Sequence, residues 1–153
     1  MLAIIILAGA IVALAITAWY LSGLWWEIPP GLVPNGSFVS AEVDNGHIIN
    51  LTFEKDVGDA RYEDCRLSIK NPQGTEYIWD LMDITWTSNE AKNSSDLLGI
   101  DMKIIRSNGQ TTFSTGNLIE LERRSGLLAE GNWLITLNYR LTSGTIATRV
   151  IMV

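Results

Sequence analysis

The sequence has no charged side chain between Met1 and Trp26, and every Lys, Arg, Asp and Glu lies after that segment. Eleven of the first 26 residues are Leu, Ile or Val. The segment also lacks a polar stripe at helical spacing, so if it is helical it is apolar on all sides. Such a helix cannot be the outer layer of a soluble domain. We expect it to be surrounded by lipid or by other apolar helices.

A helix over residues 1–26 would be about 39 Å long at about 1.5 Å per residue. A bilayer hydrocarbon core is about 30 Å thick, so this length is enough to cross it. The aromatic residues Trp19, Tyr20, Trp25 and Trp26 crowd its end. Trp and Tyr favour the membrane–water boundary, so they mark the outer limit of the apolar layer.

Basic residues are missing from both flanks of the segment, because none precedes it and the first that follows is Lys55. A membrane protein normally has a basic cytoplasmic flank, and a signal peptide begins with a basic region. One interpretation is that a short basic leader has been removed and that the sequence is the mature form. The other is an anchor without a leader, with its N-terminus outside and Met1 as an initiator residue.

Small residues are frequent in the apolar segment, and Gly9 and Ala13 lie four positions apart. Small side chains at this spacing let helix backbones approach closely. The alternative is that Ala and Gly are simply common in membrane helices. On the packing interpretation, the residues predicted to lie in helix–helix contacts are Ile5, Gly9, Ala10, Ala13 and Ile16.

Proline is scarce, and three of the four prolines fall between Glu27 and Ser37. Proline removes a backbone donor and clashes with the preceding helical turn, so the helix should end near Trp26. We therefore predict three parts: a hydrophobic N-terminal helix at 1–26, a Pro/Gly linker at 27–37, and a globular domain at 38–153.

The third part has the pattern of a β domain. The clearest strand is 132–141, where apolar and polar residues alternate over ten positions. The turn sequence Asp44-Asn45-Gly46 predicts a tight hairpin, because Asn-Gly tolerates positive φ. Other predicted strands are 37–43, 47–53, 66–70, 76–81, 84–87, 102–107, 111–114, 118–122 and 145–152. Loops are expected at 54–64, 88–101 and 123–131. The predicted class is therefore α+β: one long N-terminal hydrophobic helix followed by an antiparallel, immunoglobulin-like β-sandwich.

Cysteine and histidine are nearly absent, with one residue of each. Cys65 cannot form an internal disulfide, and a buried structural thiol is the favoured interpretation over an intermolecular bridge. His47 alone cannot build a typical zinc site and has no Ser or Cys partner in a nucleophile motif. The acidic loops near 59–64 and 96–101 lack the spacing of a calcium loop. We therefore expect no metal, no cofactor and no catalytic activity.

The formal net charge is −6, all of it beyond Trp26. A negative surface disfavours nucleic acid and anionic headgroups, because the attraction to phosphate is reversed. Three Asn-x-Ser/Thr sequons make Asn35, Asn50 and Asn93 candidate N-glycosylation sites if the domain is outside the cell. Alternation places Asn50 away from the core, and the other two are expected in polar loops.

Taken together, the layout resembles an archaeal type IV pilin. The features are an uncharged N-terminal helix rich in Ile, Ala and Val, a Pro/Gly connector and an acidic β domain. The stretch Gly126–Gly131, the strand from Asn132 to Arg140 and the turn at Thr142–Ile146 are similar to the closing hairpin of such pilins. Residue 5 is Ile, as is usual in the archaeal branch of the family. Bacterial type IV pilins carry Glu at the fifth position of the mature chain.

The resemblance implies a structural role. In that family a peptidase removes a basic leader, the apolar helix leaves the membrane to bundle with its copies, and the β domains, often glycosylated, coat the filament. We expect a homopolymeric, extracellular surface filament used for adhesion, with its subunits inserted in the cell membrane before assembly. The alternative is a single-pass envelope anchor whose immunoglobulin-like domain binds a surface layer or serves as a stator component. An envelope enzyme has no motif in its favour.

Overall fold

The computed structural model describes residues 33–106 and 109–153, which fold as one unit made of β-strands and two short 3₁₀ turns. The elements in chain order are β1 (Asn35–Asp44), β2 (Ile48–Val57), β3 (Ala60–Arg61), η1 (Tyr62–Asp64), β4 (Cys65–Lys70), β5 (Glu76–Asp80), η2 (Leu81–Asp83), β6 (Trp86–Thr87), β7 (Glu90–Ser95), β8 (Ile100–Ile105), β9 (Thr112–Phe113), β10 (Leu118–Arg123), β11 (Asn132–Tyr139) and β12 (Gly144–Met152).

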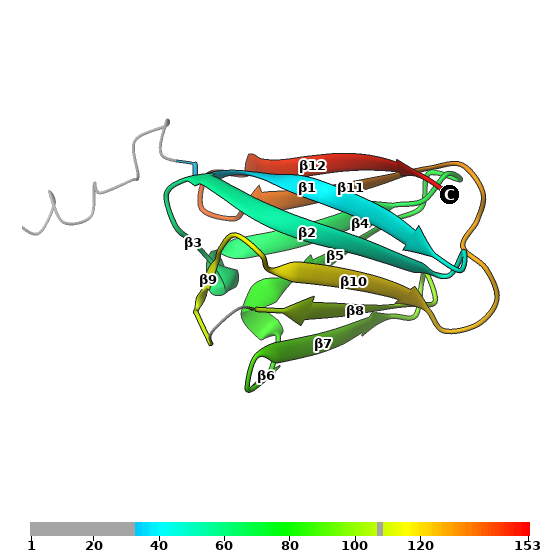
Figure 1. Ribbon diagram of the computed structural model, residues 1–153, viewed down its shortest axis with the longest axis horizontal. Coiled ribbons are helices and arrows are strands. Elements are labelled where there is room, and N and C mark those ends of the chain that lie inside the picture. Colours follow the sequence, from blue (N-terminus) through cyan, green and yellow to red (C-terminus); the bar gives the residue numbers. More distant parts are fainter. Residues whose placement is uncertain (1–32, 107–108) are drawn as a thin grey trace, which may run out of the picture. The chain divides into compact units, whose positions relative to one another are not determined.

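Two antiparallel sheets form the layers of a sandwich (Figure 1). The larger has the strand order β1-β2-β10-β8-β7-β6, and the smaller has the order β12-β11-β4-β5. Strands β3 and β9 pair separately at the end of the sandwich where the described chain begins. The core lies between the two layers, because each sheet turns its apolar residues inward.

The alternation of β11 shows how the sequence specifies this core. Trp133, Ile135, Leu137 and Tyr139 are buried, while the residues between them are at least partly exposed. Side chains of a strand point alternately to its two faces, so a period of two places one set in the core. The buried Trp133 indole donates a hydrogen bond to the Ala129 carbonyl at 2.8 Å, which satisfies its only polar atom.

The hairpin between β1 and β2 forms at the predicted Asn-Gly pair. Asn45 and Gly46 both have positive φ, at 48° and 71°, and the amide of His47 donates to the carbonyl of Asp44. Positive φ angles at both central residues are typical of a type I′ turn, whose twist matches that of the flanking strands. The strand pairing of β1 with β2 follows directly from this turn.

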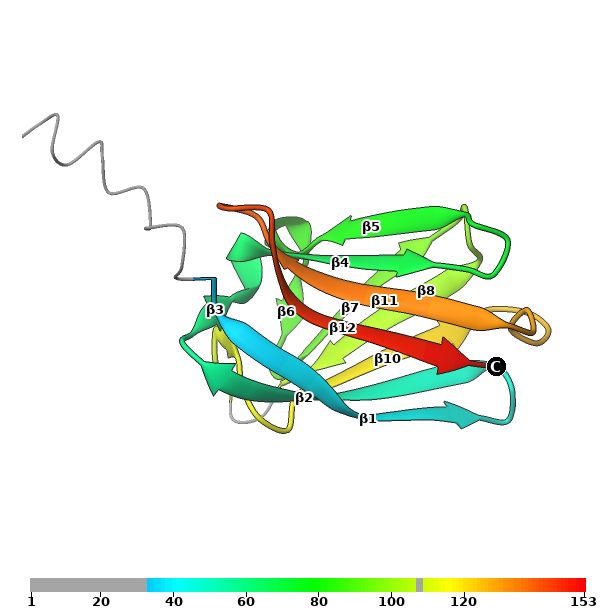
Figure 2. The same ribbon diagram turned by 90° about the horizontal axis from the view of Figure 1, so that it is seen from above.

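Strands β1 and β12 close one side of the sandwich. They belong to different sheets but run side by side in the same direction in both ribbon views (Figure 2). Near their starts, a Cβ at Gly144 would lie 2.5 and 3.0 Å from the two methyl groups of Val33, which precedes β1. The first strand is thereby held against the last one, at the edge of both sheets.

The predicted α+β class is wrong. The described chain is all β, and no helix of seven residues or more occurs between residues 33 and 106 or between 109 and 153. No helix in those ranges is long and apolar enough to span a membrane. The helix predicted for residues 1–26 and most of the predicted linker lie outside the described residues. The end of that linker is not a linker, because Asn35, Gly36 and Ser37 belong to β1.

Most predicted strands are present within a few residues of their expected bounds, but two expected loops contain strands. Residues 88–101 include β7, and residues 54–64 include the end of β2 and the short β3. The inward positions of β7 are Ala91, Asn93 and Ser95, which offer no apolar alternation. Pairing with β8, rather than a hydrophobic pattern, specifies this strand.

Gly36 provides a test of how firmly β1 is held. A Cβ at this position would meet the ring of Phe53 and lie 2.9 Å from the carbonyl oxygen of Glu54. We expect Gly36→Ala to lower the free energy of unfolding by about 1–3 kcal/mol, because the core must shift to admit the methyl group. Chemical denaturation measures this change. The neighbouring Ser37→Ala should alter stability by less than about 0.5 kcal/mol, and equal effects of the two would contradict close packing at Gly36.

Candidate functional site

The residues predicted to pack helices, Ile5, Gly9, Ala10, Ala13 and Ile16, all lie outside the described residues. The three sequon asparagines lie within them, and each is in a strand. Asn35 and Asn93 were expected in polar loops but belong to β1 and β7. Asn50 faces away from the core as expected, since its cross-strand partners are Glu42 and Glu120 on the outer face.

The three sequons differ in accessibility. Asn35 is exposed at the start of an outer strand. Asn50 is half-buried in the larger sheet, and its Oδ1 atom is buried without a hydrogen bond in the structure. In the third sequon, Ser95 is fully buried and its hydroxyl accepts from the amide of Leu98. In the folded domain, Asn35 is therefore the most accessible acceptor for a glycan.

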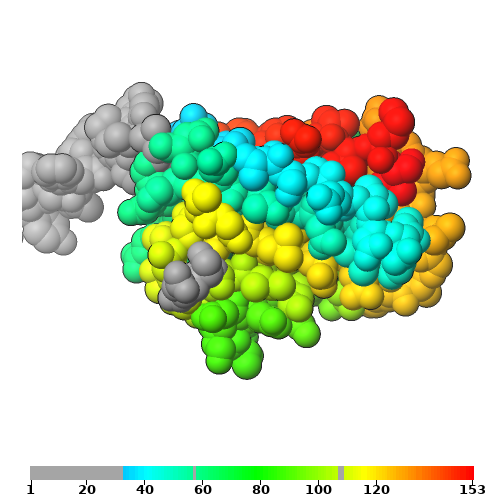
Figure 3. Space-filling model, viewed as in Figure 1, coloured from blue at the N-terminus to red at the C-terminus, as the bar shows by residue number. Residues whose placement is uncertain are grey.

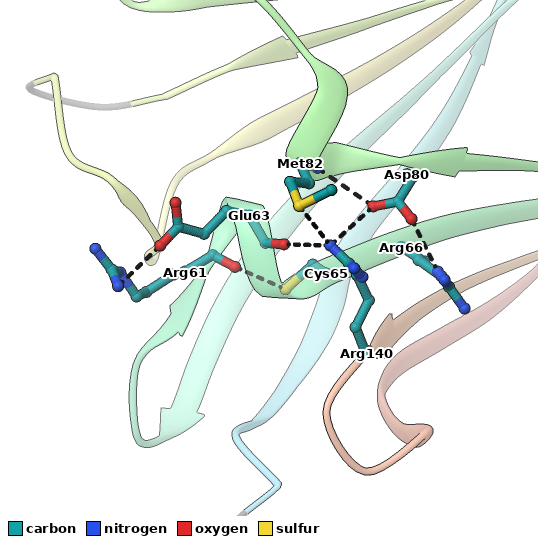
Figure 4. Close-up of polar contacts among 7 residues, drawn as sticks. All are labelled: Arg61, Glu63, Cys65, Arg66, Asp80, Met82 and Arg140. Carbon is teal, nitrogen blue, oxygen red and sulfur yellow. Dashed lines mark hydrogen bonds and ion pairs between the residues drawn. The ribbon is translucent and has the colours of Figure 1, made fainter.

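A polar network joins β11 to both 3₁₀ turns at the end of the sandwich where the described chain begins (Figure 4). Its centre is Arg140, which directly follows β11. One guanidinium nitrogen, Nη1, lies 3.1 Å from the Glu63 carbonyl oxygen, 3.1 Å from the Met82 sulfur and 3.3 Å from a carboxylate oxygen of Asp80. The Arg140 amide also donates to the carbonyl of Asp64 at 2.7 Å. One residue thereby holds η1 and η2 together.

Asp80 links this network to the outer surface of the smaller sheet. Its second carboxylate oxygen accepts from Arg66 Nε at 3.2 Å, and its first also accepts from the Met82 amide at 3.4 Å. The carboxylate thus lies between two guanidinium groups. Arg140 is about a quarter exposed, whereas half of the Arg66 side chain is exposed. The Arg140 contact is the better shielded of the two from water and salt.

Cys65 lies beneath the network and is completely buried. Its thiol donates to the carbonyl of Arg61 at 3.1 Å. Burial raises the pKa of the Cys65 thiol to about 12, and the nearby Asp64 carboxylate acts in the same direction. A thiol in these surroundings stays protonated and unreactive, so this residue is structural.

A small cavity of about 170 Å³ adjoins the network. The guanidinium carbon of Arg106 lies 4.2 Å from the centre of the Trp86 ring, a cation–π contact. Arg106 also donates to the carbonyls of Gln110 and Ser88. Tyr62 packs on Trp86, and its hydroxyl donates a hydrogen bond to Oδ1 of Asn117 at 2.9 Å. The lining residues are Arg61, Tyr62, Glu63, Leu81, Met82, Ile84, Trp86, Arg106 and Thr111.

The charged side chains that line this cavity bind one another or the backbone: Arg61 pairs with Glu63 at 2.8 Å, and Arg106 binds two carbonyl groups. Burial raises the pKa of the Tyr62 hydroxyl, so the proton stays on the oxygen at neutral pH. Among the described residues, no group of three or more His, Cys, Asp and Glu side chains is placed to hold a metal. His47 is not among the residues that line the cavity. It lies next to the Asn45-Gly46 turn, where its Nδ1 is 3.3 Å from the Asn45 carbonyl oxygen.

The outer face of the six-stranded sheet, which is turned to the viewer in Figure 3, is called the acidic face below. Its cross-strand rows hold six carboxylates and two lysines. The carboxylates are Glu42, Asp44, Glu90, Asp101, Glu120 and Glu122, and the lysines are Lys92 and Lys103. This face would repel nucleic acid and anionic lipid, and it would keep identical faces of two copies apart.

No protein-family model and no curated protein sequence matches this chain.

Sequence reasoning missed the Arg140 network and the Trp86–Arg106 contact. Arg140 was placed inside a strand predicted to end at 141, but β11 ends at Tyr139 and releases the next residue. Its partners are 58 to 77 positions away in the chain. A lone Arg at the end of an alternating strand was the only signal in the sequence.

Arg140→Ala should lower the free energy of unfolding by about 1–3 kcal/mol, because it removes the contacts to Glu63 and Asp80 and leaves a partly buried carboxylate with one fewer partner. The matched control is Arg66→Ala, which removes the more exposed partner of the same carboxylate and should cost less than about 1 kcal/mol. Urea denaturation of both variants makes the comparison. A larger effect at Arg66 would show that Arg140 does not organise this end.

Alkaline pH should destabilise the domain through Cys65. The unfolded thiol has a pKa of about 8.5, whereas the folded thiol keeps its proton to about pH 12. The stabilising contribution is complete below about pH 8.5 and is lost as the pH rises above it. By pH 10 the loss is about 2 kcal/mol, and Tyr62 and Tyr139, whose pKa values are also raised, add to it only at higher pH.

Unfolding free energies measured between pH 7.5 and 10 test this expectation. The free energy of unfolding of the Cys65→Ala variant should be lower at pH 7.5, but it should fall less steeply between pH 7.5 and 10. Identical slopes for the two proteins, or rapid labelling of the native thiol at pH 8, would contradict a buried protonated thiol.

Proposed function

We propose that this protein is a structural subunit of an extracellular helical filament of the archaeal type IV pilus kind. The observation that carries the proposal is the division of charge along the chain. Residues 1–26 contain no Lys, Arg, Asp, Glu or His, whereas the described residues fold as a charged β-sandwich. One part requires apolar surroundings, and the other is suited to water.

The physical basis of assembly is an exchange of neighbours around residues 1–26. Before assembly this segment is surrounded by lipid; in the polymer it is surrounded by copies of itself. Lipid tails are as apolar as Leu, so the exchange gains little hydrophobic free energy. Close packing at small residues such as Gly9 and Ala13 must supply the stabilisation. A head-to-tail contact that does not close on itself then produces an open helical polymer.

The sandwich has properties that suit the outer layer of such a polymer. Its core is complete without a disulfide, and its single thiol is buried, so neighbouring copies do not cross-link by oxidation. Its acidic face favours hydration and keeps filaments apart. Asn35 is exposed for a glycan. In this proposal the domain determines spacing, surface chemistry and adhesion.

A second candidate is a single-pass envelope protein that displays the β domain to a surface layer or serves as a stator component. The aromatic residues Trp19, Tyr20, Trp25 and Trp26 favour it, because Trp and Tyr are typical of a membrane boundary. The absence of a basic residue between Trp26 and Lys55 favours the filament. The two candidates differ in the final state of residues 1–26, which is alone in lipid in one and among copies in the other.

Gly9→Ile and Ala13→Leu should each abolish filaments, because a bulky side chain prevents close approach between neighbouring segments. Negative-stain microscopy of sheared surface material measures the outcome, with the protein level checked by blotting. Leu127→Ala, at an exposed residue of the sandwich, is the control and should leave filaments unchanged. Intact filaments from both segment variants would refute packing at these positions, and a native chain found only as single copies in the membrane would refute the proposed function.

A further inference from the structure

The outer face of the four-stranded sheet differs sharply from the acidic face. Figure 2 looks onto this sheet, where β11 and β12 lie next to each other. We call their outward residues the neutral strip, because none of them is charged. The strip consists of Asn132, Leu134, Thr136, Asn138, Thr145, Thr148, Val150 and Met152.

Apolar side chains lie exposed within this strip. Leu134 and Val150 are direct cross-strand partners, and 38% and 56% of their surfaces are exposed. Met152, at the end of the strip, is 76% exposed. The remaining positions are Thr and Asn, which can exchange hydrogen bonds with water for bonds with a partner. Low charge with exposed apolar groups is typical of the centre of a protein interface.

On the outer face of this sheet, each positively charged residue lies opposite a negatively charged one. Arg66 forms an ion pair with Asp80, and Lys70 has Glu76 as its cross-strand partner. Both pairs lie on β4 and β5, beside the strip rather than within it. The outer face of this sheet therefore has no excess charge, whereas the acidic face has three carboxylates for each lysine.

The acidic face is arranged to stay in water. Glu122 lies directly opposite Asp101, and Lys92 lies directly opposite Lys103. Like charges in direct cross-strand pairs are destabilising. Burying them under a partner would add the free-energy penalty of removing water from each charge. Arg124 offsets the first pair by binding Asp101 at 2.7 Å. A neighbouring protein bound to this face would have to remove water from these charged side chains.

We propose that the neutral strip is the lateral contact between copies of this chain, and that the acidic face remains in solvent. Each copy carries a net charge of −6, so identical chains repel unless they meet at surfaces without excess negative charge. The strip itself carries no charge. The exposed Arg149 of β12 is the cross-strand partner of buried Ile135 and so alternates to the other side of the strand. The inference rests on the proposed function in one respect, since a filament makes the copies neighbours.

The first experiment places a photo-reactive probe on the strip. Thr148→Cys in the full-length chain, labelled with a benzophenone maleimide in native envelopes, provides the probe, and the buried Cys65 remains unlabelled. We expect irradiation to cross-link the probe to a second copy of the chain, identified by mass spectrometry. The same probe at Thr52→Cys, on the acidic face, should give at least tenfold less of this product.

The second experiment adds charge to each face. Leu134→Glu with Val150→Glu places two carboxylates opposite each other on the strip. Leu118→Glu with Thr52→Glu does the same on the acidic face and is the matched control. We expect the strip variant to lower the fraction of chain recovered in filaments at least tenfold and the control to stay within twofold. Thermal unfolding of both variants checks that the sandwich is intact.

Failure of the inference and failure of the proposed function give different results. Filaments that form without a Thr148 cross-link between copies, or a probe that captures only lipid or another protein, would overturn the inference alone. Copies that cross-link through Thr148 while no filament forms would support the inference and refute the filament. Equal loss of filaments in the two charge variants would also overturn the inference, since the strip would then have no special role.

Discussion

The burial of inward side chains between two sheets determines where every other feature of this domain lies. β11 contributes Trp133, Ile135 and Leu137 to the core, and its alternation simultaneously fixes Leu134, Thr136 and Asn138 on the outer face. The same constraint operates in the six-stranded sheet, where Ile49 and Leu121 are buried and Glu122 is exposed. A shift of one residue in either register would exchange core and surface. The charge of each outer face is thus a consequence of how the core packs.

The two ends and two faces of the sandwich have different roles in this account. The end where the described chain begins is stiffened by Arg140, which ties both 3₁₀ turns to the end of β11. The acidic face is suited to water, and the neutral strip is suited to a neighbour. In the proposed filament the two faces meet different surroundings, water on one side and a neighbouring copy on the other.

Prediction from the sequence succeeded where the information is local. The Asn45-Gly46 turn and the β11 strand follow from residue types and a period of two, and both are present. It failed where the information is tertiary. The sequence Glu90-Ala-Lys-Asn-Ser-Ser95 has no apolar alternation, so β7 exists only through its pairing with β8. The α+β class was wrong, since residues 33–106 and 109–153 are all β. The helix predicted for residues 1–26 lies outside those ranges. The Arg140 network could not be foreseen, because its partners come from distant turns.

The most direct test of the central claim is immuno-electron microscopy of native surface material sheared from cells without detergent, with antibodies raised against residues 33–153. The account predicts filaments decorated along their whole length, because each subunit presents its sandwich to the outside while its uncharged segment lies among copies. Undecorated filaments, together with antibody found only on membrane fragments as isolated single copies, would contradict it.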